Sequence, residues 1–272
     1  MVWKAGGVSS TTRLPARVSG PALVTGAAAV TAFVLLVRVA LFSERGQAAD
    51  EQAMLTVAAG REAELTLLSI LGRVPIWSAA TLAVVCLLLA ARRHHWRAVF
   101  AAGVVIVGSN VTTQVVKHGL LERPDLGYGV HNSLPSGHVT VVVSVVAALL
   151  IVVPSGARAP VAGLGTFASG LTGLSTIVAG WHRPADVVAA LLVVLTWCAI
   201  AVVIHGGRRA RSRAVLPTAL AGAVCSLLGI VLIGVRPVEG MDGFFDASLV
   251  LGAVALVSAV VVSAVAWISP DA

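Results

Sequence analysis

The chain has 272 residues, of which 58% are hydrophobic and 11% are charged, and its formal net charge at pH 7 is +7. Soluble domains have about 25% charged residues, so this composition excludes a soluble globular protein and indicates a membrane protein. The excess of basic residues does not indicate nucleic-acid binding, because these residues form short clusters between apolar runs, where membrane topology explains them. We therefore expect membrane lipids as partners and no nucleic acid, and the sequence identifies no protein partner.

Apolar runs long enough to cross a bilayer follow one another along the chain. A helix needs about 20 apolar residues to span the hydrocarbon core. The runs predict an all-α polytopic transmembrane bundle of about eight spans, at 21–42, 76–92, 98–117, 138–154, 160–181, 184–204, 214–235 and 247–268. The polar residues 1–20 predict a cytoplasmic tail. Residues 43–75, rich in acidic residues and helix formers, predict an extracytoplasmic segment that contains an interfacial helix.

The distribution of charge predicts the orientation in the membrane. Eleven basic residues lie on one side of the predicted bundle, in the tail and in loops 92–97, 155–160 and 205–213, whereas eleven of the 12 acidic residues lie on the other side. Because basic loops remain in the cytoplasm, we expect a multi-pass cell-membrane protein with both termini in the cytoplasm. Two polar clusters, 117–138 and 181–186, then face outward.

The first polar cluster contains residue types that bind phosphate. Lys117 and Arg123 follow the third predicted span and supply a point charge and a planar fork of donors that suits phosphate oxygens. Ser136, Gly137 and His138 open the next span, where unpaired N–H groups face an anion and glycine lets it approach closely. Taken singly, the two cations could equally be interfacial residues whose side chains reach lipid headgroups.

The second polar cluster places a histidine and a carboxylate on one helical face, because His182 and Asp186 are four residues apart. The carboxylate can hold the imidazole in one tautomer and stabilise its charged form, as a nucleophilic histidine requires. His138 titrates near neutral pH and can protonate a leaving oxygen. The alternative for such a pair is an ordinary interhelical hydrogen bond.

These residues resemble the three motifs of the type 2 phosphatidic acid phosphatase and vanadium haloperoxidase superfamily. The motifs occur in the family's order, as K-x5-R-P from Lys117, P-S-G-H from Pro135 and S-x6-H-x3-D from Ser175. The resemblance covers about residues 76–204. It implies a six-helix phosphatase-like core within 21–204 and leaves 205–272 as two additional transmembrane helices.

The resemblance also implies the role of each site residue. His182 would be the nucleophile that forms a phosphohistidine, Asp186 its orienting carboxylate, and His138 the acid for the leaving group. The phosphoryl oxygens would be bound by a set of cations, a hydroxyl and a backbone N–H: Lys117, Arg123, Ser136 and Gly137. Members of the membrane branch need no metal or other cofactor.

The chain departs from the family pattern at two places. Five residues instead of six separate Lys117 from Arg123, and Thr176 stands where the third motif normally has an arginine. Arg183, beside the nucleophile, could supply part of the missing positive charge as a phosphate-binding residue, or it could bind lipid headgroups.

We expect an enzyme that removes a terminal phosphate or diphosphate from a polyprenyl or glycerophospholipid at the extracytoplasmic face. One alternative is a non-catalytic protein of the same fold that binds or transports lipid phosphates, since the missing arginine would weaken catalysis. A vanadate-dependent peroxidase is a further alternative, which a membrane-embedded, lipid-facing site suits poorly.

Overall fold

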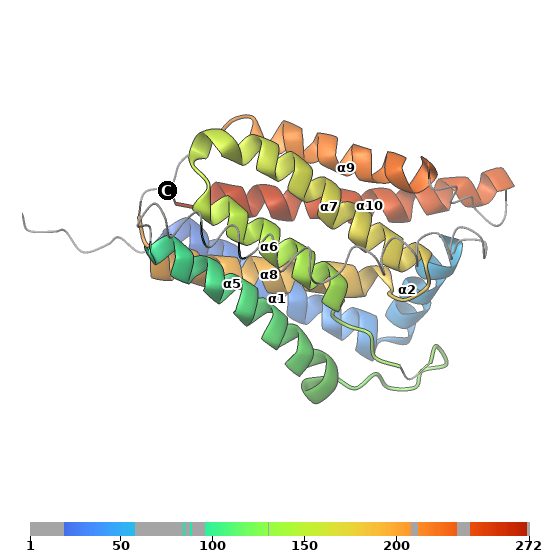
Figure 1. Cartoon of the computed structure of the whole chain (residues 1–272). Helices are drawn as coiled ribbons and strands as arrows, with labels where there is room; N and C mark the ends of the chain where they lie inside the picture. Colours follow the sequence, from blue (N-terminus) through green and yellow to red (C-terminus); the bar gives the residue numbers. More distant parts are fainter. Residues whose placement is uncertain are drawn as a thin grey trace, which may run out of the picture.

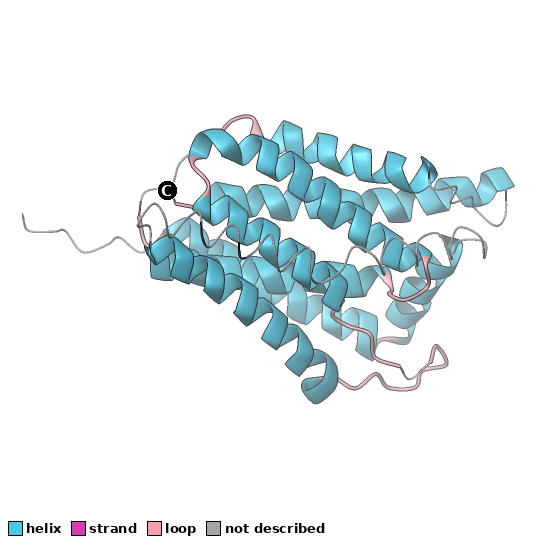
Figure 2. Ribbon diagram, in the orientation of Figure 1, coloured by secondary structure: helices cyan, strands magenta, loops and turns pink. Residues whose placement is uncertain are grey.

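The computed structural model describes residues 19–57, 84, 88, 96–129, 131–207, 212–232 and 240–270. In this part of the chain the long elements are all helices, arranged as a bundle (Figures 1 and 2). The α-helices are α1 Gly20–Phe42, α2 Glu44–Thr56, α5 Trp96–Val115, α6 Gly137–Val152, α7 Arg158–Val178, α8 Pro184–His205, α9 Val215–Leu232 and α10 Gly240–Ile268. A π-helical turn, η1 Val116–Leu120, continues α5, and a 3-10 turn, η2 Ser155–Ala157, precedes α7. The predicted all-α bundle is confirmed.

Seven of the eight predicted spans correspond to helices of the structure. Within the described residues, six helices are long and apolar enough to cross a membrane, namely α1, α5 with η1, α7 with η2, α8, α9 and α10. The seventh, α6, is apolar but shorter, with 16 residues. The predicted span 76–92 and nearly all of the tail 1–20 lie outside the described residues.

A helix, α2, covers the first part of the predicted segment 43–75, while residues 58–75 lie outside the described part of the chain, so the interfacial position of this segment stays a prediction. Ser43 begins this helix, because its hydroxyl accepts a hydrogen bond from the N–H of Gly46 at 3.3 Å. The buried Gln47 then donates from its amide to the carbonyls of Leu41, at 2.7 Å, and Pro124, at 3.1 Å. These bonds fold α2 back against the end of α1 and against the loop after α5.

The turn between α7 and α8 positions the second polar cluster. Gly180 follows α7 with a φ of 69°, a left-handed conformation that glycine adopts without strain and that commonly ends helices. Pro184 stands in the first turn of α8, where its missing N–H costs no hydrogen bond. His182 therefore lies in a short turn, directly before the N-terminus of α8.

The helix α8 lies among several others, since it contacts α1, α5, α6 and α10 along its length and also touches α2. Its apolar side chains include the fully buried Val187, Leu191 and Val194, which belong to the main hydrophobic core. On the other side of the bundle α7 packs closely on α9, where a side chain added at Gly170 would lie 2.6 Å from the hydroxyl of Ser226. Small residues allow this close approach of two membrane helices.

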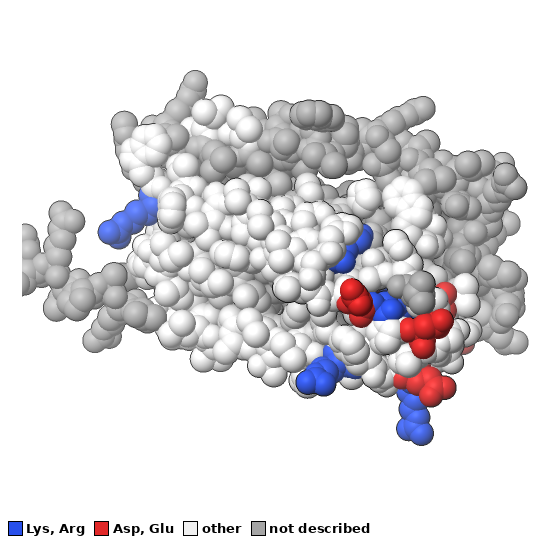
Figure 3. All heavy atoms as spheres, turned by 90° about the horizontal axis from the view of Figure 1, so that it is seen from below, with Lys and Arg blue, Asp and Glu red and all other residues white. Residues whose placement is uncertain are grey.

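The motif residues gather at one end of the bundle, the right-hand end in Figure 1, with α2 and the loop 121–136. In Figure 3 the visible acidic side chains also gather toward one end.

At the end of the bundle opposite the motif residues, the buried Arg158 donates to the carbonyls of Ser269 and Pro270, just after α10. A cavity of about 500 Å³ near Arg213 and Trp267 contains none of the motif residues.

Candidate active site

The second and third motifs meet directly in space. The N–H of Ser136, just before α6, donates to the backbone carbonyl of Asp186 in α8 at 3.0 Å. The rings of His138 and His182 then lie edge to face, with 6.4 Å between their centroids. The structure therefore brings together two histidines that are 44 residues apart in the sequence.

His182 and Asp186 form the contact that their spacing predicts. The imidazole Nδ1 lies 3.2 Å from Oδ2 of Asp186, and both side chains are buried, with relative exposures of 6% and 2%. This contact fixes which ring nitrogen faces the carboxylate. It leaves Nε2 as the nitrogen that can attack a phosphorus atom.

Ser133 is a site residue that the sequence analysis missed. Its hydroxyl donates to Oδ2 of Asp186 at 2.5 Å, and the backbone N–H of Arg183 donates to the same oxygen at 3.0 Å. The Ser133 hydroxyl and the Arg183 N–H thus hold the carboxylate in the orientation in which it contacts His182. The position two residues before Pro135 gave no signal by itself, because this contact depends on how the loop 131–136 folds onto α8.

Trp181 is a second residue whose place the sequence did not predict. Its indole lies beside the imidazole of His138, with ring centroids 5.7 Å apart and the two planes tilted by 34°. Trp181 is 37% exposed and His138 is also exposed, whereas His182 is buried. An apolar surface therefore adjoins the outer of the two histidines.

The N-terminus of α6 has the features of an anion-binding site. Ser136 stands at the N-cap but does not cap its own helix, and its buried hydroxyl has no hydrogen-bond partner among the described residues. A side chain added at Gly137 would meet only the amide of Gln114, at 3.8 Å, so the approach to the backbone is open. The first N–H groups of a helix and its positive dipole end attract an anion.

Two cations come from the first motif. Arg123 is buried, and its Nε donates to the carbonyl of Gly129 at 3.1 Å while Nη2 has no partner in the described part of the chain. Burial, followed by the positive charge of Arg183, lowers the pKa of the Arg123 guanidinium. Lys117, in η1, lies within electrostatic range of His138, and its ammonium pairs with no described side chain. Both cations are thus available to a bound phosphate.

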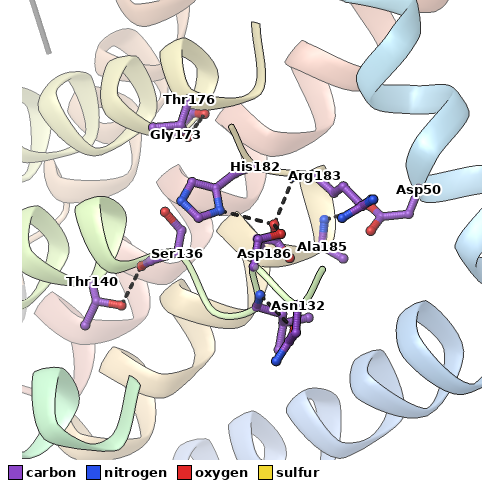
Figure 4. A network of polar contacts seen from close by, with 12 residues as sticks. Asp50, Asn132, Ser136, Thr140, Gly173, Thr176, His182, Arg183, Ala185 and Asp186 are labelled. Atoms are coloured by element: carbon purple, nitrogen blue, oxygen red, sulfur yellow. Dashed lines mark hydrogen bonds and ion pairs between the residues drawn. The ribbon is translucent and has the colours of Figure 1, made fainter. Parts of the chain in front are cut away.

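Arg183 is held on its outer side by α2. Its Nε lies 2.6 Å from Oε2 of Glu51, and its Nη2 donates to the carbonyl of Tyr128 at 3.3 Å. Asp50, the neighbour of Glu51, accepts a hydrogen bond from the N–H of Ala185 at 2.9 Å. In Figure 4 the Arg183 side chain extends toward Asp50 and away from the His182 ring. Sequence reasoning placed residues 43–75 on the same outward side as the polar clusters, but it did not predict that Asp50 and Glu51 contact residues 183–185.

Thr176 occupies the place of the usual arginine without supplying a charge. Its buried hydroxyl donates to the carbonyl of Gly173 at 2.8 Å, within α7 (Figure 4). Its own carbonyl accepts from the N–H groups of Trp181, at 3.0 Å, and His182, at 3.2 Å. The backbone at this position therefore supports the turn that carries the nucleophile candidate.

Comparison with known proteins agrees with this geometry. A family model described as the PAP2 superfamily matches residues 98–212, which include α6, α7, α8 and all three motifs. No curated protein and no solved structure matches the chain. The match begins at residue 98, whereas the resemblance was expected to begin at about residue 76. It does not include α1, α2, α9 or α10. Residues 98–212 are therefore similar to the PAP2 superfamily, the family that the motifs resemble.

Proposed function

We propose that this protein is an integral membrane lipid phosphatase that acts through a phosphohistidine intermediate. The observation that carries the proposal is the convergence of His138 and His182, from two distant motifs, beside an open helix N-terminus and two cations. Phosphoryl transfer requires a nucleophile, an acid for the leaving oxygen and donors for the phosphoryl oxygens. The similarity to the PAP2 superfamily and the apolar helices support a phosphatase-type membrane protein.

In the first step, Nε2 of His182 attacks the phosphorus atom as the bond from phosphorus to the leaving oxygen breaks. Asp186 accepts the Nδ1 hydrogen bond and stabilises the positive charge that develops on the ring. His138 gives its proton to the leaving oxygen, so that the lipid departs as an alcohol, or as a monophosphate when the substrate is a diphosphate.

In the second step, His138 has lost its proton and acts as a base toward water. The water oxygen attacks phosphorus, the phosphorus–nitrogen bond breaks, and inorganic phosphate is released while His182 is regenerated. In both steps Lys117, Arg123, Ser136 and the N–H of Gly137 stabilise the charge on the phosphoryl oxygens.

A lipid is the substrate class that the surroundings of His138 favour. The leaving group must lie beside the acid that protonates it, and the ring against His138 is the partly exposed Trp181. An indole offers apolar contact area to an alkyl or isoprenoid chain. The apolar helices around the site favour a substrate that arrives within the bilayer. The charge asymmetry of the loops favours the extracytoplasmic face.

The test is phosphate release by the purified protein from polyprenyl diphosphate, phosphatidic acid and phosphatidylglycerophosphate, without added metal. We expect turnover of at least one of these lipids, and a loss of roughly 10⁴-fold or more in His182→Ala. His131→Ala, which changes an exposed loop histidine, should retain wild-type turnover. Equal turnover in His182→Ala and wild type would refute the mechanism.

A second candidate is a protein of the same fold that binds or transports lipid phosphates without hydrolysing them. Thr176 favours it, because the usual arginine is missing and the threonine hydroxyl donates to a carbonyl within α7. Thr176→Arg distinguishes the two, with Thr176→Val as a control for loss of the hydroxyl. A phosphatase limited by the missing cation should gain about tenfold or more in turnover with arginine. A binding protein should bind lipid phosphate equally well in wild type and His182→Ala and release no phosphate.

A further inference from the structure

The helix α2 has no role in the proposed reaction, although it contacts both loops of the site. It lies outside the matched residues 98–212, so the similarity to the PAP2 superfamily does not account for it. Gln47, Asp50 and Glu51 are spaced so that they share one face of the helix. Each of the three bonds to a segment next to a motif residue. Gln47 bonds to the carbonyl of Pro124, beside Arg123, and the other two bond to residues 183 and 185.

The contact with Arg183 reaches the nucleophile candidate through the backbone. The N–H of Arg183 donates to the Asp186 oxygen that also contacts His182, at 3.0 Å and 3.2 Å respectively. The side chain of the same arginine is held by Glu51 at 2.6 Å. A shift of Arg183 would therefore move the N–H that orients Asp186, and it would move His182 as the preceding residue.

The ion pair between Arg183 and Glu51 is shielded from solvent. The two side chains are only 12% and 23% exposed, so screening by water and salt is weaker than for a surface pair. Asp50 adds a second attachment two residues further along, because it accepts the N–H of Ala185 in the first turn of α8. A carboxylate at a helix N-terminus also interacts favourably with the helix dipole.

We propose that α2 is a positioning element of the active site, in which Glu51 and Asp50 hold residues 183–185 and so keep His182 and Asp186 in place for phosphoryl transfer. This inference rests on the proposed phosphatase function. It assigns Arg183 a positioning role, in place of the phosphate-binding role that the sequence suggested. The two roles predict opposite results when Glu51 loses its charge.

The experiment uses the full-length protein in detergent and four variants: Glu51→Gln, Arg183→Gln, the double variant, and the double variant with the charges exchanged, Glu51→Arg with Arg183→Glu. Glu44→Gln serves as the control, because Glu44 is exposed on the same helix and pairs with no described residue. The measured quantities are kcat, KM and the affinities for orthovanadate and inorganic phosphate. Orthovanadate resembles the transition state, so its affinity reports on the geometry of His182.

We expect each single substitution to lower kcat and vanadate affinity about tenfold, with phosphate affinity and KM changed about twofold or less. The double variant should be no worse than either single variant, and exchanging the charges should restore most of the loss. The control should match wild type.

The proposal is overturned if Arg183→Gln weakens phosphate binding while Glu51→Gln strengthens it, because Arg183 would then be a phosphate ligand. It is also overturned if the single effects add in the double variant, or if the single variants match wild type. A wild type that binds vanadate but hydrolyses no lipid phosphate refutes the phosphatase function, while the vanadate affinities of the variants still decide the role of α2. A wild type that does not bind vanadate refutes both.

Discussion

The carboxylate of Asp186 is the residue on which most of the site geometry depends. One of its oxygens contacts the hydroxyl of Ser133, the N–H of Arg183 and the imidazole of His182. A carboxylate with several donors in a buried place is held in one orientation. The orientation of the nucleophile candidate therefore depends on groups that never touch a substrate.

Ser133→Ala tests this dependence. Removing a hydrogen bond to a buried charged group costs about 1.5–3 kcal/mol, so we expect kcat to fall by about 10- to 100-fold. KM should change little, because the Ser133 hydroxyl bonds to Asp186, which is not among the residues proposed to bind phosphate. Ser133→Thr keeps the hydroxyl and should recover much of the activity. Equal kcat in Ser133→Ala and wild type would show that this bond does not orient the carboxylate.

Asp50 gives a prediction about stability and pH. Burial raises the pKa of Asp50 from 3.8 to about 6, an effect that the N–H of Ala185 partly opposes. The folded protein therefore binds more protons than the unfolded chain between those two pH values. The free energy of unfolding that this group contributes therefore falls as the pH rises from about 4 to 6. Asp50→Asn keeps an oxygen acceptor for Ala185 but removes the charge.

We therefore expect Asp50→Asn to unfold at a higher temperature than wild type at pH 7.5, by about 2–4 °C. The difference should shrink at pH 5, where Asp50 in wild type is mostly protonated. Thermal unfolding of the detergent-solubilised protein at both pH values measures this, with Glu44→Gln as the control. A lower midpoint for Asp50→Asn at pH 7.5 would contradict the argument.

At the residue scale, the sequence predicted the part of the site that lies within motifs. The predicted contact of His182 with Asp186 is present, but the two residues do not share a helical face, because His182 lies in the turn before α8 and reaches Asp186 across the start of the helix. The order of the motifs anticipated the approach of His138. Ser133, Trp181, Asp50 and Glu51 were not predicted as site residues, because their contacts join segments up to 135 residues apart. No local pattern encodes such contacts.

At the scale of the helices, the lengths of the hydrophobic runs predicted which helices form more accurately than where each helix begins and ends. The start of α8 was predicted at residue 184, where Pro184 begins the helix. The helix α10 begins at Gly240, seven residues before the predicted start at 247, because polar residues continue the helix beyond the apolar run. The contacts of α2 with the motif segments could not be predicted, since Gln47, Asp50 and Glu51 bond to residues far away in the sequence.

The end of α10 gives a prediction at the same scale. Arg158 is fully buried and donates to the carbonyls of Ser269 and Pro270, which follow the last turn. Helix C-termini leave carbonyls unpaired, and a cation there is favourable. We expect Arg158→Leu to destabilise the protein by about 2–3 kcal/mol, because buried carbonyls lose a charged donor.

Thermal unfolding in detergent measures this loss, with Arg97→Leu as the matched control, an exposed arginine near the start of α5. The protein that remains folded should retain its kcat, because Arg158 begins α7, whereas the third motif lies at the other end of that helix and in the turn after it. An unchanged midpoint in Arg158→Leu would show that these bonds do not contribute to stability.

For the whole molecule, the structure places the three motifs at one end of an apolar bundle (Figure 1). Such an arrangement lets a lipid remain in the bilayer while its phosphate reaches polar groups at the surface. In the proposed function, residues 98–212 supply the chemistry, while the helices outside this range, α1, α2, α9 and α10, pack against it. The account of function then depends on one event, the transfer of phosphate to His182.

Trapping the phosphorylated protein tests that event most directly. The purified protein is mixed briefly with a lipid phosphate labelled on its terminal phosphate, denatured with alkali, and mapped by mass spectrometry. The account predicts an acid-labile, alkali-stable phosphate on His182 in wild type and in His131→Ala, and none in His182→Ala. A phosphate on another residue, or turnover of the lipid with no phosphorylated protein at any time, would contradict it.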